Sequence, residues 1–569
     1  MTRPQARWTA APVLDEDVVV SLASSLTVAT PIARLLVHRG YGDAAAAKKF
    51  LRPRLEQLHS GSTMMSLGVA VDRLVRAVRG GELIMIHGDY DVDGICSTTL
   101  LVRAIRGVGG KVVPFIPNRM TDGYDLGAAG VARAIELGAK VVVTCDCGTS
   151  ALEPVLALNA AGIDVVISDH HLPRETLPDS LALLNPRRPG CEYPDKDLAA
   201  VGVAFKLALA LAQSMGVNDA FIWKMLDLVA LATVADVASL RGENRVFVRY
   251  GMKMISETEN VGLRALLRAS GMDGKPLTAG RIGFTLAPRL NAAGRLGHAL
   301  RGVELLLTDS PSEANVIARE LEELNQRRQT LDRATLDEAR SMAEPMIKSG
   351  AIGLVLAKEG WHPGVVGIVA SRVVEEYSRP AILVAMEGAT GKGSGRSVSG
   401  FDLHSALGEC ADLLLRFGGH RAAAGVTVAA SNISAFAMRF DEVARSRLAI
   451  QDLVPELRVD AEIELDQAAL DLEPTLRHFE PFGIGNPSPV FAARNVISLG
   501  APRRVGRDGL KLTLAGKTGT QIEAIGWGLG DLAPSIAPGA TLDVAFRLER
   551  DEYNGVSRLQ ARIADIVVR

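Results

Sequence analysis

The sequence has few aromatic residues and no excess of charge of either sign. Phe, Trp and Tyr make up only 4% of the chain, so any surface that stacks nucleobases must depend on few side chains. The 63 basic and 65 acidic residues nearly cancel, which excludes a chain-wide cationic field for a polyanion or a membrane. Any site for a polyanion must therefore be local.

Cysteine and long apolar runs are also scarce. The five cysteines are odd in number and lie in apolar or motif-like segments, which favours a reducing cytoplasm over a disulfide framework. The first residues, MTRPQARWTA, do not resemble a signal peptide, and no window holds 18 uninterrupted apolar residues, so we expect no membrane contact. With 48% apolar residues over 569 positions, we expect a soluble globular protein of about three or four domains.

Residues 80–190 alternate short apolar runs with helix-like segments, a pattern typical of a parallel sheet buried on both faces. Three of the apolar runs end in the polar clusters HGDYDVDG, TCDCGTS and SDHH, which begin at His87, Thr144 and Ser168. The carboxyl ends of strands in such a sheet lie along one rim. We therefore expect the three clusters to converge.

The rest of the chain changes pattern three times. Residues 196–306 are mostly helical in pattern, and a long helix is predicted from Ser310, with a capping serine, Pro311 and Glu313. A second α/β region follows to about residue 450. Five period-two stretches then predict a small β-barrel of the oligonucleotide-binding (OB) type, namely 456–465, 511–516, 521–527, 541–550 and 559–568. Asn554 and Gly555 are placed in its last hairpin turn.

The predicted fold class is therefore α/β. It comprises two α/β lobes joined by a long helix, followed by a C-terminal OB-like β-barrel. The expected boundaries are an N-terminal extension at 1–50, a catalytic domain at 51–306, a connecting helix at 307–348, a second α/β domain at 349–452 and a nucleic-acid-binding barrel at 453–569.

Crowded carboxylates form the strongest chemical signal. Asp89, Asp91 and Asp93 stand on alternate residues directly after an apolar run, and carboxylates this close repel one another unless a cation or backbone donors compensate. Asp146, Asp236 and the triplet Asp169, His170 and His171 extend the set. It is large enough for two divalent cations, and ligands without thiolate suit Mn²⁺ or Mg²⁺. Two such ions about 4 Å apart activate a bridging water for phosphoester hydrolysis.

Simpler interpretations exist for each residue alone. An aspartate after a strand often caps the next helix, whereas the coincidence of all the clusters at strand ends favours catalysis. Cys145 and Cys147 imitate half of a zinc site, but without a second pair we interpret them as small side chains beside the centre. GATGKGSG has glycines too closely spaced for a phosphate loop, and Lys392 precedes a glycine, so we reject a nucleoside triphosphatase.

In order and spacing, HGDYDVDG, VTCDCGTS, SDHH and ATVADV resemble the four motifs of the DHH phosphoesterases. GKGSGRS and RFGGHRAAAG resemble the glycine-rich signatures of the DHH-associated domain, while PRLNAAGR and PFGIGNPSPVF resemble segments of the RecJ branch. The similarity covers roughly residues 50 to 569. It implies a two-metal exonuclease, specific for single-stranded DNA, that works from 5′ to 3′ and releases 5′-mononucleotides in DNA repair and recombination.

The resemblance also assigns roles at the metal centre. His87 and Asp91 match ligands of one metal, and Asp93, His170 and Asp236 match ligands of the other. Asp146 matches the bridge between them. Two catalytic residues complete the set: Asp89 is an extra acid beside the first metal, and His171 contacts the scissile phosphate or assists the leaving group.

For the nucleic acid, the resemblance implies that Arg119, Ser394 and Arg396 hold a 5′ phosphate and that His420 faces the substrate. Arg289 and Arg295 line the path of the strand, as does Arg327 or Arg328, although ordinary surface charge remains an alternative for all four. In the barrel, Arg503, Arg504 and Arg507 form the densest basic cluster. The nearest stacking candidates are Phe482, Phe491 and Trp527, although such aromatics are more often core residues.

Two other functions stay open at this point. A DHH phosphoesterase for small phosphorylated substrates or short oligonucleotides would need neither the barrel nor the long helix. A non-catalytic relative with a decayed site would have lost ligands, yet the whole set is present. The family further implies single-strand-binding protein and a helicase as partners.

Overall fold

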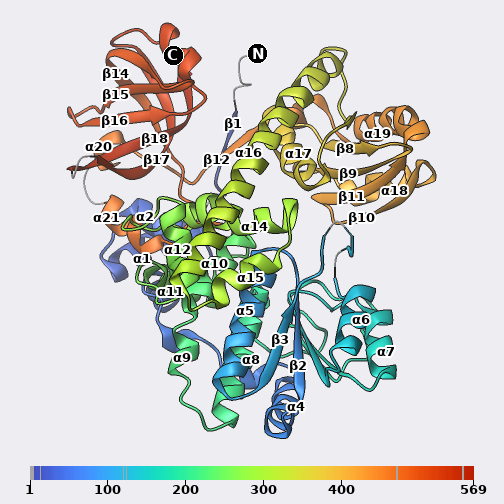
Figure 1. Cartoon of the computed structure of the whole chain (residues 1–569). Helices are drawn as coiled ribbons and strands as arrows, with labels where there is room; N and C mark the ends of the chain where they lie inside the picture. The colour runs from blue at the N-terminus through green and yellow to red at the C-terminus, as the bar shows by residue number, and fades with distance from the viewer. Residues whose placement is uncertain (1–5, 13, 120, 124, 469–471, 554–555) are drawn as a thin grey trace. The chain divides into compact units, whose positions relative to one another are not determined.

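The computed structural model describes residues 6–12, 14–119, 121–123, 125–468, 472–553 and 556–569. It divides the chain into two compact units (Figure 1). The first unit comprises residues 49–327 and 479–487, and the second comprises residues 1–48, 328–478 and 488–569. The predicted turn at Asn554 and Gly555 lies outside the described residues.

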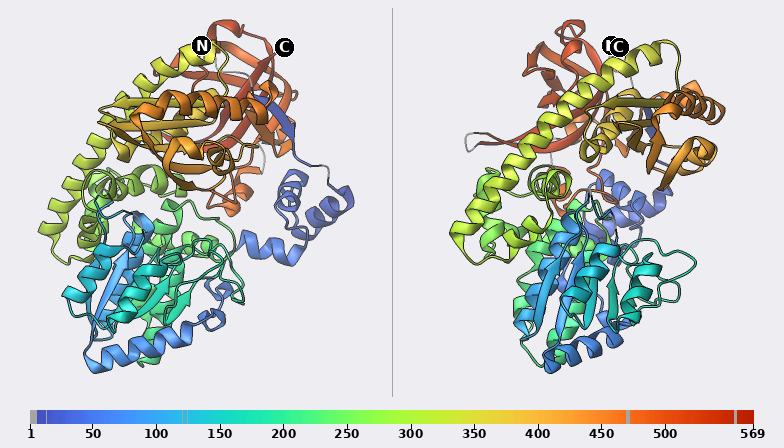
Figure 2. Two further views of the ribbon diagram at one scale, coloured as in Figure 1. Left: turned by 90° about the vertical axis from the view of Figure 1, so that its right-hand side faces the viewer. Right: turned by 45° about the vertical axis from the view of Figure 1, so that its right-hand side comes forward.

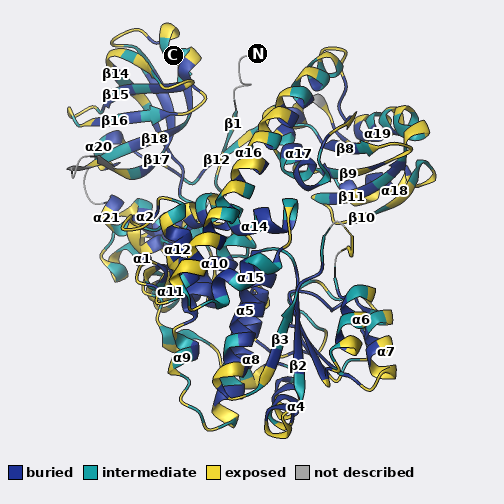
Figure 3. Cartoon of the chain, viewed as in Figure 1, coloured by how far each residue is buried: buried dark blue, intermediate teal, exposed yellow. Residues whose placement is uncertain are grey.

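The first unit is built on a five-stranded parallel sheet in the order β3-β2-β4-β5-β6. Successive strand residues face opposite sides, so Ile84 and Ile86 join one apolar core while Met85 joins another. Figures 1 and 3 show the buried strands between two layers of helices. The strands are β2 (Leu83–Gly88), β3 (Lys111–Phe115), β4 (Val141–Cys145), β5 (Asp164–Ser168) and β6 (Ala182–Leu184), and the covering helices are α4 (Leu67–Gly80), α5 (Val92–Gly107) and α8 (Ala200–Ser214) on one face and α6 (Ala128–Glu136) and α7 (Leu152–Ala160) on the other.

The strand order brings the three polar clusters together. β2, β4 and β5 are neighbours in parallel register, with Gly88 opposite Cys145 and Cys145 opposite Ser168. The clusters begin at the carboxyl ends of these three adjacent strands, so the predicted convergence on one rim is confirmed.

Residues 196–306 are mostly helical, as predicted. One stretch departs from regular α-helix, because residues 282–286 form a π-helix between two α-helical segments. The elements after α8 are α9 (Ala220–Trp223), α10 (Leu226–Ala235), α11 (Gly242–Ser256), α12 (Val261–Ala269), α13 (Ala279–Arg281), the π-helix η3 (Ile282–Leu286), α14 (Ala287–Leu296) and α15 (Leu300–Leu307).

Asp227 is a buried acid in α10 whose ionisation should make stability depend on pH. It accepts hydrogen bonds from Leu228 N and Thr258 Oγ1 at 2.7 and 2.5 Å, but burial raises its pKa to about 6. The folded state therefore holds this proton more tightly than the unfolded chain, where the pKa is about 3.9. The resulting stabilisation is present below about pH 4 and is lost as the pH rises through 6.

We therefore expect Asp227→Asn to gain up to about 3 kcal/mol of unfolding free energy relative to the wild type between pH 4 and pH 7. Urea denaturation of both proteins at each pH measures the difference. A difference that stays constant over this range would contradict the prediction.

A 38-residue helix, α16 (Pro311–Lys348), leads from the first unit to the second. At 1.5 Å per residue it is about 57 Å long, and Figure 2 shows it as one unbroken helix. Ser310 Oγ accepts from Glu313 N at 3.4 Å, and Thr308 Oγ1 donates to the Glu313 carboxylate at 2.5 Å. The predicted start of this helix and its Ser310 cap are confirmed, but the Glu313 carboxylate accepts from Thr308 instead of closing a capping box with Ser310 N, which donates to Thr308 Oγ1.

The second α/β region contains a five-stranded mixed sheet in the order β10-β11-β9-β8-β7. The predicted strands and intervening helix of this region are present. GATGKGSG forms the turn and second strand of the β8–β9 hairpin and does not lead into a helix, which agrees with the rejection of a phosphate loop. The elements are β7 (Leu354–Glu359), α17 (Pro363–Tyr377), β8 (Ala381–Glu387), β9 (Thr390–Arg396), α18 (Leu403–Gly408), β10 (Leu414–Gly419), β11 (Ala423–Ala429) and α19 (Ile433–Arg447).

The C-terminal region is a closed five-strand barrel, as predicted, in the order β14-β15-β16-β18-β17 with β17 pairing back to β14. The prediction that residues 456–465 form one strand of this barrel was wrong. Of residues 456–465, Glu456–Val459 (β12) pairs with β1 (Arg7–Ala10) in a separate sheet, and only Ala461–Glu462 (β13) joins β14. The barrel strands are β14 (Phe491–Val505), β15 (Gly509–Ala515), β16 (Gln521–Gly526), β17 (Thr541–Tyr553) and β18 (Val556–Val568).

The N-terminal residues belong to the second unit, beside the barrel. In addition to the β1–β12 pairing, Trp8 Nε1 donates to Asp565 in β18 at 2.7 Å. Three helices follow: α1 (Glu16–Leu26), α2 (Thr30–His38) and α3 (Ala44–Leu51). Among the described residues, no single helix is long and apolar enough to cross a membrane; only α1 and α2 together, bent by 116°, meet the criteria of length and composition.

Candidate active site

Asp91 and Asp93 fix the start of α5 and are themselves held by backbone donors. Asp91 caps the helix by accepting from Asp93 N and Gly94 N at 2.9 and 3.2 Å. Asp93 accepts from Ala200 N and Val201 N, at the start of α8, at 3.0 and 2.8 Å. The simpler interpretation of Asp91 as a cap is therefore correct, but the caps leave both carboxylates within one acidic cluster.

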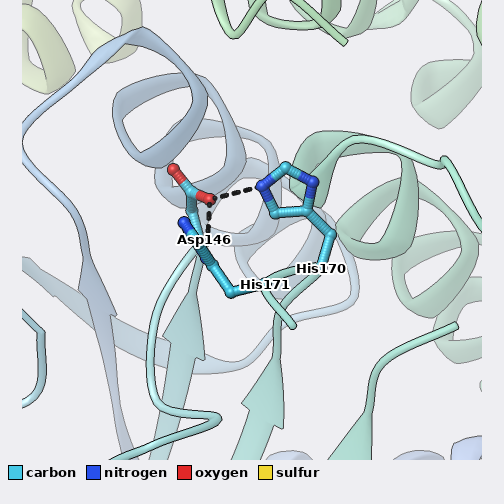
Figure 4. Close-up of side chains that lie close together, drawn as sticks. All are labelled: Asp146, His170 and His171. Atoms are coloured by element: carbon cyan, nitrogen blue, oxygen red, sulfur yellow. Dashed lines mark ion pairs between the residues drawn. The ribbon is translucent and has the colours of Figure 1, made fainter. Parts of the chain in front are cut away.

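Asp146 lies where the loop leaves β4, in left-handed backbone with φ +63°. Its Oδ1 atom lies 3.2 Å from His170 Nε2 and 3.8 Å from His171 Nδ1, as Figure 4 shows. His170 Nε2 and this oxygen are not aligned as a hydrogen bond, and Asp146 Oδ1 is buried without a hydrogen-bond partner among the described atoms. Asp89 Oδ1 is buried in the same way. Buried oxygens of this kind are suited to a cation.

Potential metal ligands gather in three overlapping groups, each with ligand atoms within 4.8 Å of one another. His170 Nε2 also lies 3.8 Å from Asp236 Oδ2, which follows α10 directly. Asp146 and His170 each take part in two groups. The groups are Asp146, His170 and His171; Asp93, His170 and Asp236; and Asp89, Asp91 and Asp146.

The carboxyl groups in this cluster resist ionisation when no cation is present. Burial, followed by repulsion from Asp91, raises the pKa of Asp93 to about 7. Burial, followed by repulsion from Asp93 and Asp91, raises the pKa of Asp236 to about 9, and the pKa of Asp89 and Asp146 is raised well above the usual range for the same reasons. Divalent charge would relieve this repulsion, so the donor set fits the expected metal ions.

Asp169 belongs to the acidic set predicted from the sequence, but the resemblance gave it no individual role. Its buried carboxylate accepts from three backbone N–H groups, those of Thr149, His170 and His171, at 3.0, 2.7 and 3.2 Å. It also lies 2.8 Å from His171 Nδ1. Burial alone would lower the pKa of His171, but the Asp169 carboxylate raises it to about 9. His170, by contrast, has its pKa lowered to about 4 by burial and by the charge of His171.

His87 lies at the end of β2 but belongs to none of the three ligand groups. Its ring is buried against Phe115, with the ring centroids 5.3 Å apart, and Cys147 Sγ lies 3.6 Å from its Nδ1 atom. Its Nε2 atom has no hydrogen-bond partner among the described residues. Cys147 is thus a buried side chain beside this site, as we interpreted it from the sequence.

The PRLNAAGR segment, in α14, braces the loop that carries the first three acids. Asn291 Oδ1 accepts from Val92 N at 3.2 Å. Gly294 lies so close to the Tyr90 carbonyl that a Cβ atom would come within 2.4 Å of its oxygen. Tyr90 belongs to this loop, and the Arg119 guanidinium lies over its ring, 4.9 Å from the ring centroid. Arg295 also interacts electrostatically with Tyr90. Asn291 is a residue that the sequence did not single out.

The other basic candidates of this region differ in whether their charge is already paired with an acidic side chain. Arg289 is paired with Glu322 on α16 and donates to the Thr285 carbonyl. Arg328 is buried and lies 3.5 Å from Asp332, whereas Arg327 is exposed. Their predicted contact with the strand stays a prediction.

Ser394, Arg396 and His420 lie in the second unit. Arg396 Nη1 donates to Ser394 Oγ at 3.0 Å and to the Gly395 carbonyl at 2.8 Å. A Cβ atom on Gly367 in α17 would lie 2.9 Å from Ser394 Oγ and 3.3 Å from Arg396 Nη2, so the absence of a side chain leaves room beside this pair. His420 is exposed in the turn between β10 and β11.

The basic cluster of the barrel lies at the turn between β14 and β15. Arg503 and Arg507 are exposed, while Arg504 Nη2 donates to the Arg507 carbonyl at 2.9 Å. Trp527 is 51% exposed and lies close to the glycines of the same turn. Of the other two stacking candidates, Phe482 lies in the first unit and Phe491 is fully buried in the barrel core. Phe491 is therefore a core residue, the alternative that the sequence favoured, and not a stacking surface.

Known families match three regions of the chain. The N-terminal domain of the DHH family matches residues 83–233, the DHHA1 domain matches residues 350–446 and the RecJ OB domain matches residues 459–565. The order of the three agrees with the predicted catalytic domain, second α/β domain and barrel.

Whole-chain relatives carry one name, single-stranded-DNA-specific exonuclease RecJ. The relative from Dickeya dadantii is 37% identical over 93% of this chain and 94% of its own length, and that from Bacillus subtilis is 36% identical over 97% of this chain and 70% of its own. The crystal structure of RecJ from Thermus thermophilus in complex with Mn²⁺ matches 99% of this chain and 80% of that chain, with a TM-score of 0.84 at 34% identity. The corresponding Mg²⁺ complex has a TM-score of 0.79. The chain therefore belongs to the RecJ family of DHH phosphoesterases.

Proposed function

We propose that this protein is a single-stranded-DNA-specific exonuclease that hydrolyses DNA from 5′ to 3′, releasing 5′-mononucleotides with the aid of two divalent cations, Mn²⁺ or Mg²⁺. The observation that carries the proposal is the gathering of acidic and imidazole ligand atoms at three adjacent strand ends, with buried carboxylate oxygens that have no hydrogen-bond partner. Membership of the RecJ family supplies the substrate and the polarity.

The ligand groups support a division of labour among the side chains. Asp93, His170 and Asp236 would hold one cation. Asp91 and Asp146 would hold the other cation, and the Asp89 carboxylate is close enough to join them. His87 is a further candidate ligand from the family motif. Asp146 would bridge, since it shares one group with Asp89 and Asp91 and another with His170, which is assigned to the first cation. Bound cations would lower the pKa of a water and neutralise the charge that develops on the phosphate.

His171 is the residue of this chain best placed to act on the phosphate itself. Its ring is held by the buried Asp169 carboxylate 2.8 Å away, and its side chain is 43% exposed, whereas that of His170 is only 12% exposed. A protonated imidazole in this position would donate to a phosphate oxygen or to the leaving oxygen. We propose that Asp169 positions His171 and thereby keeps its donor directed at the substrate.

We propose that Ser394 and Arg396, in the second unit, hold the 5′ phosphate. The role that the resemblance gives to Arg119, in the first unit, stays a prediction. The Arg396 guanidinium is preorganised by two hydrogen bonds beside the gap at Gly367, and a guanidinium is well suited to two phosphate oxygens.

We expect Arg396→Ala to slow hydrolysis of 5′-phosphorylated strands by roughly 10- to 100-fold, because one charge-assisted contact of about 1.5–3 kcal/mol is lost. Strands with a 5′ hydroxyl should be slowed much less. Initial rates on matched strands measure this effect, with the exposed Arg439→Ala in α19 as control. Equal slowing of both strands would show that Arg396 does not recognise the phosphate.

Arg503 and Arg507 are proposed to hold the backbone of downstream nucleotides. Replacing both with alanine should weaken binding of a long single strand and make the slope of log Kd against log salt shallower by about 1.4, at ~0.7 for each lost phosphate contact. Titrations at several salt concentrations test this, with Lys517→Ala as the control, because the Lys517 ammonium already pairs with Glu464 at 2.8 Å. An unchanged slope would assign the barrel another task.

The function itself is tested with single and double strands labelled at either end, incubated in Mn²⁺, in Mg²⁺ and in chelator. We expect labelled mononucleotides from the 5′ end of single strands only, and none in chelator. Digestion from the 3′ end, or equal attack on a blunt duplex, would refute the proposal. Cleavage confined to dinucleotides would favour a phosphoesterase of small substrates.

The family further supports cooperation with single-strand-binding protein and a helicase, which would supply unpaired DNA during repair and recombination. We place this activity in the cytoplasm, since all five cysteines are buried free thiols. We also retain the division into five regions given above, with the two compact units as its coarser frame.

A further inference from the structure

Phe284 stands out among the apolar side chains of the first unit. It is 89% exposed, the largest value among the exposed large apolar side chains of the described residues. Aromatic residues are scarce in this chain, and an exposed phenyl ring gives up the stabilisation that burial would provide. A single exposed apolar side chain needs no explanation in itself, but Phe284 lies in a π-helix, a distortion often found at functional sites.

The backbone that carries Phe284 is held by buried neighbours and by Arg289. It lies in the π-helix η3, whose neighbours Ile282 and Leu286 are fully buried. Arg289 donates to the Thr285 carbonyl and pairs with Glu322, so its guanidinium braces this turn. The π turn adds a residue to the helix, a distortion frequently found at functional sites. Phe284 is therefore projected outward from a fixed scaffold.

This scaffold is joined to the metal centre on two sides. Gly283 faces α10, where a Cβ atom would lie 3.6 Å from Val234 Cγ1, two residues before Asp236. On the other side, α14 continues from the π-helix to Asn291, whose Oδ1 atom accepts from Val92 N. Seven residues of helix separate Phe284 from Asn291, a rise of about 10 Å. The π-helix that carries Phe284 is thus packed against α10, which leads to Asp236, and is continuous with α14, which braces the start of α5.

The dimensions and surroundings of the site favour one kind of occupant. A single exposed ring is far smaller than the apolar surface that a stable protein interface requires, but it matches the face of one nucleobase, and such stacking does not depend on sequence. Arg281, one turn before Phe284, and Arg295, one residue after Gly294, are cations suited to the phosphates of the same strand.

We propose that Phe284 is a stacking platform for one unpaired nucleobase of the strand that enters the metal centre. The proposal rests on the proposed function and adds a specificity residue to it. A base within a duplex already stacks on its neighbours and cannot offer its face to this ring without unpairing, so the platform favours single strands over paired ones.

The test compares Phe284→Ala, Phe284→Trp and the wild type on single strands that carry one abasic residue at successive positions from the 5′ end. We expect Phe284→Ala to raise KM for the intact strand by roughly 5- to 150-fold with little change in kcat, since a stacked base contributes about 1–3 kcal/mol. When the abasic residue is at the position that stacks, the KM of the wild type should rise by a similar factor. The KM of Phe284→Ala should rise no further. Phe284→Trp should restore the KM.

Leu156→Ala is the matched control, because Leu156 is a 55% exposed apolar residue of α7 in the same unit. Its KM should not change. The melting temperature of Phe284→Ala shows whether the fold is intact, and little change is expected for so exposed a side chain. An unchanged KM for Phe284→Ala would overturn the proposal, as would effects of the substitution and the abasic residue that add at every position. A changed oligomeric state of Phe284→Ala with no effect on DNA would also overturn it.

Failure of the proposed function would be visible separately. A wild-type protein that does not degrade single strands in Mn²⁺ would refute the exonuclease. Binding of the same strands, measured by fluorescence anisotropy, would still test Phe284. At the stacking position, the abasic residue should weaken binding by the wild type but not by Phe284→Ala. If it weakens binding by both, Phe284 is not a stacking platform.

Discussion

Asp146→Asn lowers the exonuclease rate by roughly a thousandfold or more, because the substitution removes the charge that joins two ligand groups while keeping the shape of the side chain. In the metal-free protein, however, the same substitution should raise the melting temperature. The Asp146 carboxylate is buried among Asp93, Asp91 and Asp236, and both burial and repulsion raise its pKa; a neutral amide relieves that cost.

The two opposite effects make the prediction specific. Rates on a 5′-phosphorylated single strand in Mn²⁺ measure the first effect, and thermal melting in chelator measures the second. Added Mn²⁺ should then stabilise the wild type more than the variant, since binding to the folded state alone raises stability. Asp273→Asn, at an exposed acid, is the control and should change neither quantity. Near-normal turnover by Asp146→Asn would refute the shared-metal arrangement.

The polar rim of the first sheet was predictable because each strand and the polar cluster that follows it are adjacent in the sequence. Each apolar run of residues 80–190 became a parallel strand, and the three polar clusters follow strands that pair directly with one another. Strand pairing then determines that Asp91, Asp146 and His170 lie close together. The order β3-β2-β4-β5-β6 is not written in any single segment, but the rule that strands end on one rim was sufficient.

Residues that act through other residues were less accessible to sequence analysis. Asp169 was visible as part of a triplet, but its three backbone donors depend on the path of the chain after β5. Asn291 lies about 200 residues from the loop that it braces. Phe284 has the pattern of an ordinary helix residue, and periodicity predicts neither its exposure nor the π turn that carries it.

The barrel shows why irregular strands escape a period-two criterion. β14 is a 15-residue strand that was not predicted, because FAARNVISLGAPRRV does not alternate cleanly. Its pairing shifts register between Ala493 and Val496 and again between Leu499 and Arg503. Asn495 and Gly500 have positive φ at these irregularities, as expected of bulges that close a barrel. Residues 456–465 alternate better but pair mainly with β1 from the other end of the chain.

The second large effect is expected at Asp169, through His171. Asp169→Asn keeps an oxygen to accept from the backbone, but it removes the carboxylate that holds His171 Nδ1 at 2.8 Å. Without that partner the imidazole loses both its orientation and the charge that favours its protonated form. A positioned proton donor contributes roughly 100- to 10,000-fold to a rate, so we expect kcat to fall by about that factor.

A role in positioning His171 differs measurably from a role in holding the metal. His170 N also donates to Asp169, at 2.7 Å, so a general disturbance of this loop would displace a proposed ligand and weaken Mn²⁺ binding. If Asp169 acts on His171, the Mn²⁺ concentration for half-maximal activity and the KM for DNA should stay nearly unchanged while kcat falls. His171→Ala should then lose a similar factor, and the double variant little more, because both changes remove the same donor. Additive losses, or a large shift in the Mn²⁺ requirement, would show that Asp169 instead supports the metal ligand beside it.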